Sequence, residues 1–212
     1  QCGIGYIPHG PFGQGTQHAI TQLLEVAIGR AKQQGAAFVR VEPVGGDTDL
    51  TLVTMGEAGF RSAPHFVQNR STGYVELDRT EDELIASFKP KTRYNIRLAM
   101  RRQVDVRIAT DSADLESFYR LTVATGHRDG FAVHSSTYYR AVWDAFGNSK
   151  RHLFIASVNG EDVSAVVVVI CGTMATYLYG ASSNHYRNTM STYLLQWTAI
   201  RWAKQQGCLT YD

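Results

Sequence analysis

The pentapeptide Ala-Lys-Gln-Gln-Gly occurs twice in this chain, at residues 31–35 and again at residues 203–207. Each copy follows apolar residues at helical spacing, and it supplies a basic last turn and a glycine that ends the helix. With Ala31 placed on Ala203, 172 positions apart, further positions agree: Leu23 with Leu195, Ala27 with Ala199 and Ile28 with Ile200. Duplication explains this agreement, and a chance repeat of a common helix ending is the alternative.

The segments that flank the two helices are also alike. The strand-like pieces "GIGYIP" and "ATYLYG" precede them, and "AAFVRV" and "CLTYD" follow them. The repeated unit is therefore predicted to be strand, loop, helix and strand, which favours duplication over chance.

Other elements are predicted from local signals. Thr80 and Glu83 have the spacing of a capping box, and a second helix is expected after Pro90. Asn159-Gly160 predicts a hairpin turn between two apolar runs. A strand is expected over residues 60–68.

We interpret the whole as a mixed α/β fold of two similar lobes, with mostly antiparallel sheets flanked by helices. Residues 1–88 are expected to form a partial first lobe. Residues 89–212 are expected to form a second lobe that lacks its C-terminal strands. Because the chain begins with Gln and stops at Asp212, truncation at both ends is expected.

Composition excludes several classes of protein. With 44% hydrophobic and 19% charged residues the chain is globular, and no apolar run reaches the ~20 residues that span a bilayer. The three cysteines are widely spaced, which predicts neither a disulfide framework nor a zinc knuckle and favours a reducing cytosol. The seven histidines form no H-x-x-x-H or H-E-x-x-H pattern, and no G-x-S-x-G elbow occurs. No metal site is expected.

The most basic stretch is "FKPKTRYNIRLAMRRQ" from Phe88. On a helix, Arg93, Arg97 and Arg101 lie on one face at i, i+4 spacing, and with Lys91 they could contact phosphates. A solvated helix face is the alternative, since the net charge of the chain is only +2.

The second half resembles the GNAT acyltransferases in its order of elements, and in those enzymes a glycine-rich loop before a helix holds the coenzyme A pyrophosphate. The equivalent segment here has no glycine between Ser182 and Trp197. The phosphate cradle of an acyl-CoA enzyme is therefore not expected.

Several motifs in one order resemble the Fem family of peptidoglycan-bridge aminoacyltransferases. They are "FKPKTRYNIRLA", "FYRLTVATGHRDGFAVHSSTYYRAVWDAF", "LFIASVNGEDVSAVVVV" and "TYLYGASSNHYRNTMSTYLLQWTAIRWAKQQGC". "GYIPHGP" and "FVRVEP" near the N-terminus agree as well, so the resemblance covers nearly the whole chain. Because the family has two GNAT-like lobes related by duplication, the twin helix ends would be equivalent. The family's Trp- and Lys-containing first segment and its C-terminal Phe-Lys strand are not in this sequence.

The resemblance implies a cytoplasmic enzyme that transfers an amino acid from aminoacyl-tRNA to a stem-peptide amine of a peptidoglycan precursor. The precursor would be UDP-MurNAc-pentapeptide or its lipid-linked form, with a possible peripheral contact with the membrane. No cofactor is implied, since aminoacyl-tRNA is a co-substrate. Two alternatives are an acyl-CoA-dependent GNAT N-acyltransferase and a non-catalytic lobe that binds precursor or tRNA.

The resemblance also implies site residues. It places His134, Tyr138, Tyr179, Tyr177 and Arg187 with the precursor, and it makes Tyr179 a catalytic residue. The family often has arginine at the position of His134, so histidine there would weaken a permanent charge contact and make it pH-dependent.

Glu42 matches an acidic family position at the cleft edge, where a general base could lie. A structural carboxylate at a strand end is the alternative reading of that residue. The basic residues Lys91, Arg93 and Arg97 are expected to contact tRNA phosphates.

Overall fold

The computed structural model describes residues 3–10, 17–43, 50–69, 71–147 and 149–212. Its contacts divide the chain into two compact units, residues 1–72 and 73–212. Residues 73–88 therefore group with the second unit in the structure. A lobe boundary at 88/89, which concerns duplication rather than contact, stays a prediction.

The first unit contains a parallel pair of strands joined by a helix. β1 (Gly3–Pro8) pairs with β2 (Ala36–Glu42), and α1 (Gln17–Gln33) connects them. Ile20 and Leu24 of α1 are buried with Met55 of α2 (Leu50–Glu57). Gly35 has φ +68°, the left-handed conformation that ends helices and that glycine adopts without strain.

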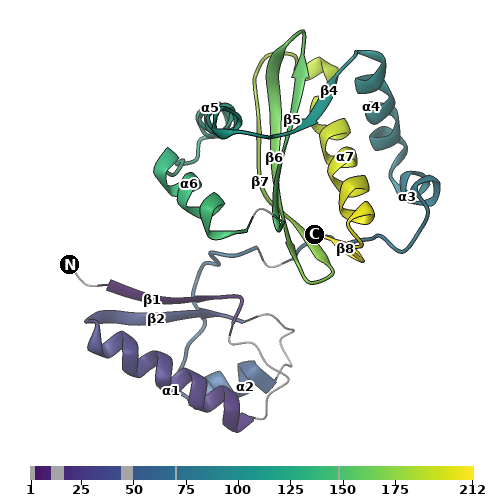
Figure 1. Ribbon diagram of the computed structural model, residues 1–212. Coiled ribbons are helices and arrows are strands. Elements are labelled where there is room, and N and C mark those ends of the chain that lie inside the picture. Colours follow the sequence, from purple (N-terminus) through teal and green to yellow (C-terminus); the bar gives the residue numbers. More distant parts are fainter. Residues whose placement is uncertain (1–2, 11–16, 44–49, 70, 148) are drawn as a thin grey trace. The chain divides into compact units, whose positions relative to one another are not determined.

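The second unit is built on a six-stranded sheet (Figure 1). The strand order is β3-β8-β7-β6-β5-β4, and every pairing is antiparallel except that of β7 with β8. The bounds are β3 (Val75–Glu76), β4 (Asp105–Ile108), β5 (Arg151–Val158), β6 (Glu161–Cys171), β7 (Met174–Ser182) and β8 (Thr210–Tyr211).

Helices cover both faces of this sheet. The helices of one face are α3 (Glu81–Ser87), α4 (Pro90–Arg101) and α7 (Ser191–Gln205), and those of the other are α5 (Ser112–Asp129) and α6 (Ser136–Ala145) (Figure 1). The apolar run of β6 is buried on both sides, with Val166 and Val168 in the α7-side core and Ala165 and Val167 in the α5-side core. Burial on both faces explains why β6 does not alternate apolar with polar residues.

The predicted repeat is present in the structure. β7, α7 and β8 form a second strand, helix and strand unit with parallel strands, like β1, α1 and β2. Gly207 has φ +80° at the end of the second "AKQQG", as Gly35 does in the first. The mixed α/β fold class predicted from the sequence is confirmed.

Local predictions have mixed outcomes. Thr80 and Glu83 form a capping box, and Asn159 and Gly160 have positive φ in the turn between β5 and β6, so both predictions are confirmed. The strand predicted over residues 60–68 is wrong, since none of these residues is in a strand. The N–H groups of Val67 and Gln68 donate to the Glu42 carboxylate, a partner that a regular strand would not need.

Among the described residues, no helix has the length and apolar character required to cross a membrane.

Candidate functional site

Two glycines shape the connection between α5 and α6. Gly130 ends α5 with φ +74°, and its N–H and that of Phe131 both donate to the Gly126 carbonyl, at 2.9 and 3.2 Å. A Cβ at Gly126 would lie 2.3 Å from a methyl carbon of Val133. Glycine at this position therefore lets the chain cross close to α5 on its way to His134.

The start of α6 places one exposed and one buried tyrosine side by side. Ser135 is the N-cap, and its hydroxyl accepts from the Tyr138 N–H at 3.2 Å. The Tyr138 side chain is 41% exposed, whereas Tyr139 is 7% exposed. The exposed His134 ring stacks on Tyr138 with centroids 4.1 Å apart and planes at 27°.

A β-bulge in β7 decides which tyrosine reaches this place. Tyr179 pairs with Val167 and Tyr177 pairs with Val168, so Leu178 is the extra residue in the strand. Because Val167 and Val168 point to opposite cores, Tyr179 lies on the α5 side and Tyr177 on the α7 side. Tyr177 is therefore not brought to the place predicted for it beside Tyr179.

Tyr179 completes a group that we call the tyrosine cluster, which consists of His134, Tyr138, Tyr139 and Tyr179. The Tyr138 and Tyr179 hydroxyl oxygens are 3.5 Å apart. The Tyr139 ring meets the Tyr179 ring edge to face at 5.3 Å, and Phe118 of α5 packs behind Tyr139 at 5.5 Å. Edge-to-face pairs of this kind contribute about 0.5–1.5 kcal/mol beyond burial, which favours one fixed arrangement of the hydroxyls.

The environment of the cluster keeps its central hydroxyl protonated. Burial raises the pKa of Tyr179 far above its usual value, and the Tyr138 hydroxyl raises it further. Burial likewise raises the pKa of Tyr139. At neutral pH the Tyr179 hydroxyl is therefore a hydrogen-bond donor rather than a proton acceptor.

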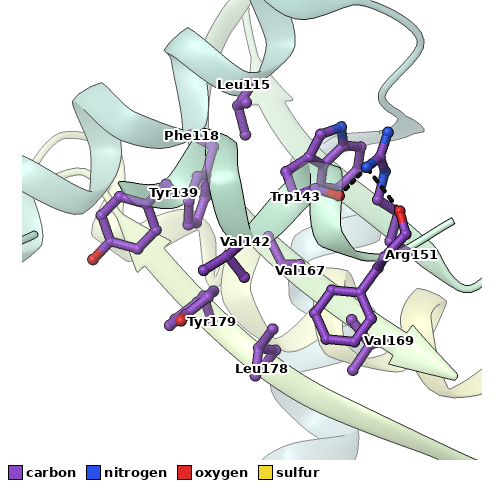
Figure 2. Close-up of a pocket in the computed structure, with 11 residues that line it drawn as sticks. Leu115, Phe118, Tyr139, Val142, Trp143, Arg151, Val167, Val169, Leu178 and Tyr179 are labelled. Atoms are coloured by element: carbon purple, nitrogen blue, oxygen red, sulfur yellow. Dashed lines mark hydrogen bonds between the residues drawn. The ribbon is translucent and has the colours of Figure 1, made fainter. Parts of the chain in front are cut away.

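The gap beneath the cluster is too small for a substrate. Its volume is about 10 Å³, which is close to the space that one water needs. Figure 2 shows Tyr139 and Tyr179 at one end of this gap and Trp143 with Arg151 at the other. Arg151 donates to the carbonyls of Trp143 and Phe146 at the end of α6, and its guanidinium lies 4.4 Å from the centroid of the Trp143 ring. The gap is thus part of the core that supports the cluster. The accessible side of the cluster is formed by the exposed edges of His134 and Tyr138.

The two ends of the cluster are tied together by side chains of α5. The N–H of Ser182, at the end of β7, donates to the Thr125 hydroxyl at 2.9 Å, and Arg128 donates to the Ser182 carbonyl at 2.8 Å. These bonds fix β7 against α5, and so Tyr179 against the α5–α6 connection.

Arg187 lies in the 3₁₀ turn η1 (Arg187–Thr189) before α7. The pKa of Asp129 is lowered first by the hydrogen bond from Arg128 and also by the positive charge of Arg187. Among the described residues, no hydrogen bond, ion pair or ring contact joins Arg187 to the tyrosine cluster.

The three basic residues predicted to contact tRNA differ in the structure. Lys91 and Arg97 are exposed on α4. Arg93 instead turns back along the chain and donates to the carbonyls of Ala86 and Phe88, at the end of α3. Those two bonds give Arg93 a structural partner.

Glu42 belongs to the first unit, at the end of β2. Its carboxylate accepts from the N–H groups of Val67 and Gln68 at 2.8 Å, from Arg40 at 2.8 Å and from the Tyr6 hydroxyl at 3.0 Å. The pKa of Glu42 is lowered from 4.5 to about 2, first by the Val67 bond, while burial acts in the opposite direction. A carboxylate with this pKa accepts a proton poorly at neutral pH.

Sequence reasoning missed the supporting residues. Tyr139 belongs to the cluster, and Phe118 and Thr125 touch or hold it, yet all three occupy ordinary helical positions and match no catalytic motif. The two glycines of "TGHRDG" were the available signal, since glycines near a helix end predict a close approach of backbone. Among the described residues, no group of three His, Cys, Asp or Glu side chains could hold a metal ion.

Comparisons with known proteins identify the family and the fold. The family model of the acetyltransferase (GNAT) domain matches residues 86–212. The Lipid II:glycine glycyltransferase of Staphylococcus aureus is 25% identical over 92% of this chain, and the chain spans 64% of that relative's length.

Solved structures share the fold over most of the chain. The structure titled "Crystal structure of FemX" has a TM-score of 0.80 at 22% identity, covering 98% of this chain and 70% of that one. L-PGS from Bacillus licheniformis has a TM-score of 0.58 at 14% identity, covering 93% of this chain and 58% of that one. Since the family model matches more than half of the chain, this protein belongs to the acetyltransferase (GNAT) domain family, and its predicted resemblance to the Fem proteins is confirmed.

Proposed function

We propose that this chain is the core of an aminoacyltransferase that moves an amino acid from aminoacyl-tRNA to a stem-peptide amine of a lipid-linked peptidoglycan precursor. The observation that carries the proposal is the tyrosine cluster on a GNAT fold, in which the hydroxyl of the exposed Tyr138 lies 3.5 Å from that of the half-buried Tyr179 and His134 stacks on Tyr138. The name of the Staphylococcus aureus relative favours the lipid-linked acceptor over the UDP-linked one. Because aminoacyl-tRNA is the donor, the proposal includes a cytoplasmic location. Because the acceptor is lipid-linked, it includes peripheral contact with the membrane.

The chemistry is aminolysis of an ester. The neutral amine attacks the ester carbonyl, a C–N bond forms, and the carbonyl oxygen becomes an oxyanion. The C–O bond to the ribose then breaks, and the amine proton passes to the ribose oxygen. Because Tyr179 stays protonated, its hydroxyl is suited to donate a hydrogen bond to the oxyanion. Tyr138 and His134 would orient the acceptor beside it.

We do not assign Glu42 as the proton acceptor of this reaction. Its pKa of about 2 and its four hydrogen-bond donors favour the structural role over that of a general base. An alkyl ammonium has a pKa near ~10.4, so the acceptor would lose its first proton to solvent before attack. Holding both substrates in place would then supply much of the rate.

The geometry of the loop before α7 argues against the acyl-CoA alternative. Tyr186 and Met190 have φ +56° and +59°, so side chains occupy positions where a phosphate loop has glycine. The N–H groups of Thr189, Met190 and Tyr193 donate to protein carbonyls. These three donors are not available to a pyrophosphate, and no coenzyme is therefore proposed.

The test is transfer of radiolabelled glycine from glycyl-tRNA to lipid-linked precursor, with the protein expressed from its complete coding sequence. Labelled precursor supports the proposal, and single charged tRNA species then identify the preferred amino acid. Label on UDP-linked precursor alone would correct the acceptor. Consumption of acetyl-CoA with a simple amine, without transfer from tRNA, would favour the acyl-CoA reading. Binding of either substrate without any transfer would favour a non-catalytic lobe.

A further inference from the structure

One basic surface of the second unit lies apart from the tyrosine cluster. Between Leu84 and Val104 the chain has six Lys or Arg residues and no Asp or Glu. Solvated helices commonly mix both signs, because oppositely charged side chains three or four residues apart stabilise them. A helix with one sign alone forgoes that stabilisation, which points to a role for the charge.

Four residues of α4 form a continuous exposed face that we call the α4 ridge: Lys91, Tyr94, Arg97 and Arg101. They are three, three and four residues apart, so they lie along one side of the helix. The opposite side, with Ile96 and Ala99, is buried in the core. At 1.5 Å per residue the ridge is about 15 Å long.

The charges of the ridge have no ion-pair partner within the described part of the protein. None of Lys91, Arg97 and Arg101 takes part in an ion pair there, in contrast to Arg107 and Arg128. Arg93 and Arg102 of the same run are occupied instead, since Arg102 donates to the Asn188 carbonyl at 2.9 Å. The structure thus separates two residues of the basic run that hold the fold from a ridge whose cations form no ion pair in the described part of the chain.

An exposed aromatic ring lies in the middle of the ridge. Tyr94 is 56% exposed, and the guanidinium of Arg101 lies 5.8 Å from its centroid. Arginine makes bidentate contacts with phosphate, and an exposed ring beside it offers a surface on which a base can stack. The ridge has two arginines and one lysine beside the ring, and this combination of bidentate donors with a stacking surface favours a nucleic acid over an anionic membrane.

We infer that the α4 ridge binds the sugar-phosphate backbone of an RNA, with Tyr94 stacking on an unpaired base. The inference rests on the proposed function in taking tRNA as the RNA. It adds a second contact surface to the one that receives the reacting ester. Binding would depend steeply on salt, since each phosphate contact releases a counterion.

The test measures binding of uncharged tRNA by fluorescence anisotropy across salt concentrations, with no acceptor present. The variant Arg97→Gln/Arg101→Gln is compared with a matched control, Arg61→Gln/Lys150→Gln, which removes two exposed charges elsewhere. The slope of log K against log salt is negative. We expect its magnitude to decrease by about 2 in the ridge variant and to stay unchanged in the control. Tyr94→Ala should weaken binding at least about fivefold, whereas Tyr94→Phe should bind as wild type does.

Equal slopes for the ridge variant and wild type would overturn the inference. The inference would also be overturned if the ridge variant lost binding to phosphatidylglycerol vesicles and kept its binding to tRNA, because that result would assign the ridge to a membrane. Unfolding temperatures of all variants should match wild type, because every substituted residue is exposed. Since binding is measured without transfer, an inactive protein that binds tRNA through the ridge would overturn only the proposed function.

Discussion

The ring of Tyr139 meets the ring of Tyr179 edge to face, with centroids 5.3 Å apart and planes at 86°. One ring is buried in the core and the other carries the hydroxyl proposed to meet the oxyanion. The position of that hydroxyl is therefore set by packing in the layer beneath it, where Phe118 and the end of α6 also lie. Substitutions can separate the chemical role of the outer ring from the structural role of the inner one.

Tyr179→Phe should lower kcat roughly 100-fold, because it removes one hydrogen-bond donor to the developing oxyanion and leaves the ring in place. The affinity for tRNA should stay at the wild-type value. Tyr177→Phe is the matched control, since the bulge places that hydroxyl on the other face of the sheet. Equal losses in the two variants, measured in the glycyl transfer assay, would count against the role of Tyr179.

Tyr139→Ala should destabilise the second unit by about 3–5 kcal/mol, because it leaves a cavity among packed aromatic rings. Tyr138→Ala should change the free energy of unfolding by less than about 1 kcal/mol, since that side chain is 41% exposed. Urea unfolding followed by tryptophan fluorescence measures both. A small loss for Tyr139→Ala would show that the cluster is not supported from beneath.

Gly126→Ala should force the α5–α6 connection to move, because the added Cβ would lie 2.3 Å from Val133 and 3.0 Å from the Phe131 carbonyl oxygen. We expect a loss of about 1–3 kcal/mol in stability and a lower kcat, since His134 follows the displaced segment. Gly29→Ala in α1 is the control: no atom lies within 4 Å of its Cβ, so the variant should gain about 0.5–1 kcal/mol. Wild-type turnover and stability in Gly126→Ala would contradict this account of the glycine.

Glu42 should make the stability of the first unit depend on pH. Its folded pKa, about 2, lies below the ordinary value of 4.5, so the stabilisation is complete above about pH 5 and is lost as the pH falls through 4.5 toward 2. Glu42→Gln should unfold at a lower temperature at pH 7 and should show a flatter decline between pH 5 and pH 3. Retained stability together with abolished transfer would instead restore the general base.

The sequence predicts most of the scaffold, because its signals are local. A capping box at Thr80 and a turn at Asn159-Gly160 depend on residues within a few positions of each other, and both are present. The strand predicted over residues 60–68 was wrong. The apolar residues of this segment indicate a strand, but the Glu42 carboxylate, some 25 positions earlier, accepts from two of its backbone N–H groups.

For the site, contacts between residues close in sequence could be predicted, whereas contacts between residues far apart in sequence could not. The motif that contains His134 and Tyr138 indicates their neighbourhood, since both lie at the start of one helix. Their contact with Tyr179 depends on the register of the sheet. Within the described part of the chain, Arg93 is bonded and Arg97 is exposed because Arg93 alone reaches carbonyls at the end of another helix. Neither relationship is written in the spacing of the residues concerned.

The bulge at Leu178 also affects how relatives should be aligned. In a regular strand, tyrosines two positions apart share a face, so an alignment without a gap treats Tyr177 and Tyr179 as members of one surface. A relative with the same Tyr-x-Tyr spacing in a regular strand would present both tyrosines on one face, whereas this chain presents only Tyr179 on the α5 side. Homologues should therefore be compared by which side chain pairs with the equivalent of Val167, because a one-residue slip in this strand exchanges the surface that faces α5 for the one that faces α7.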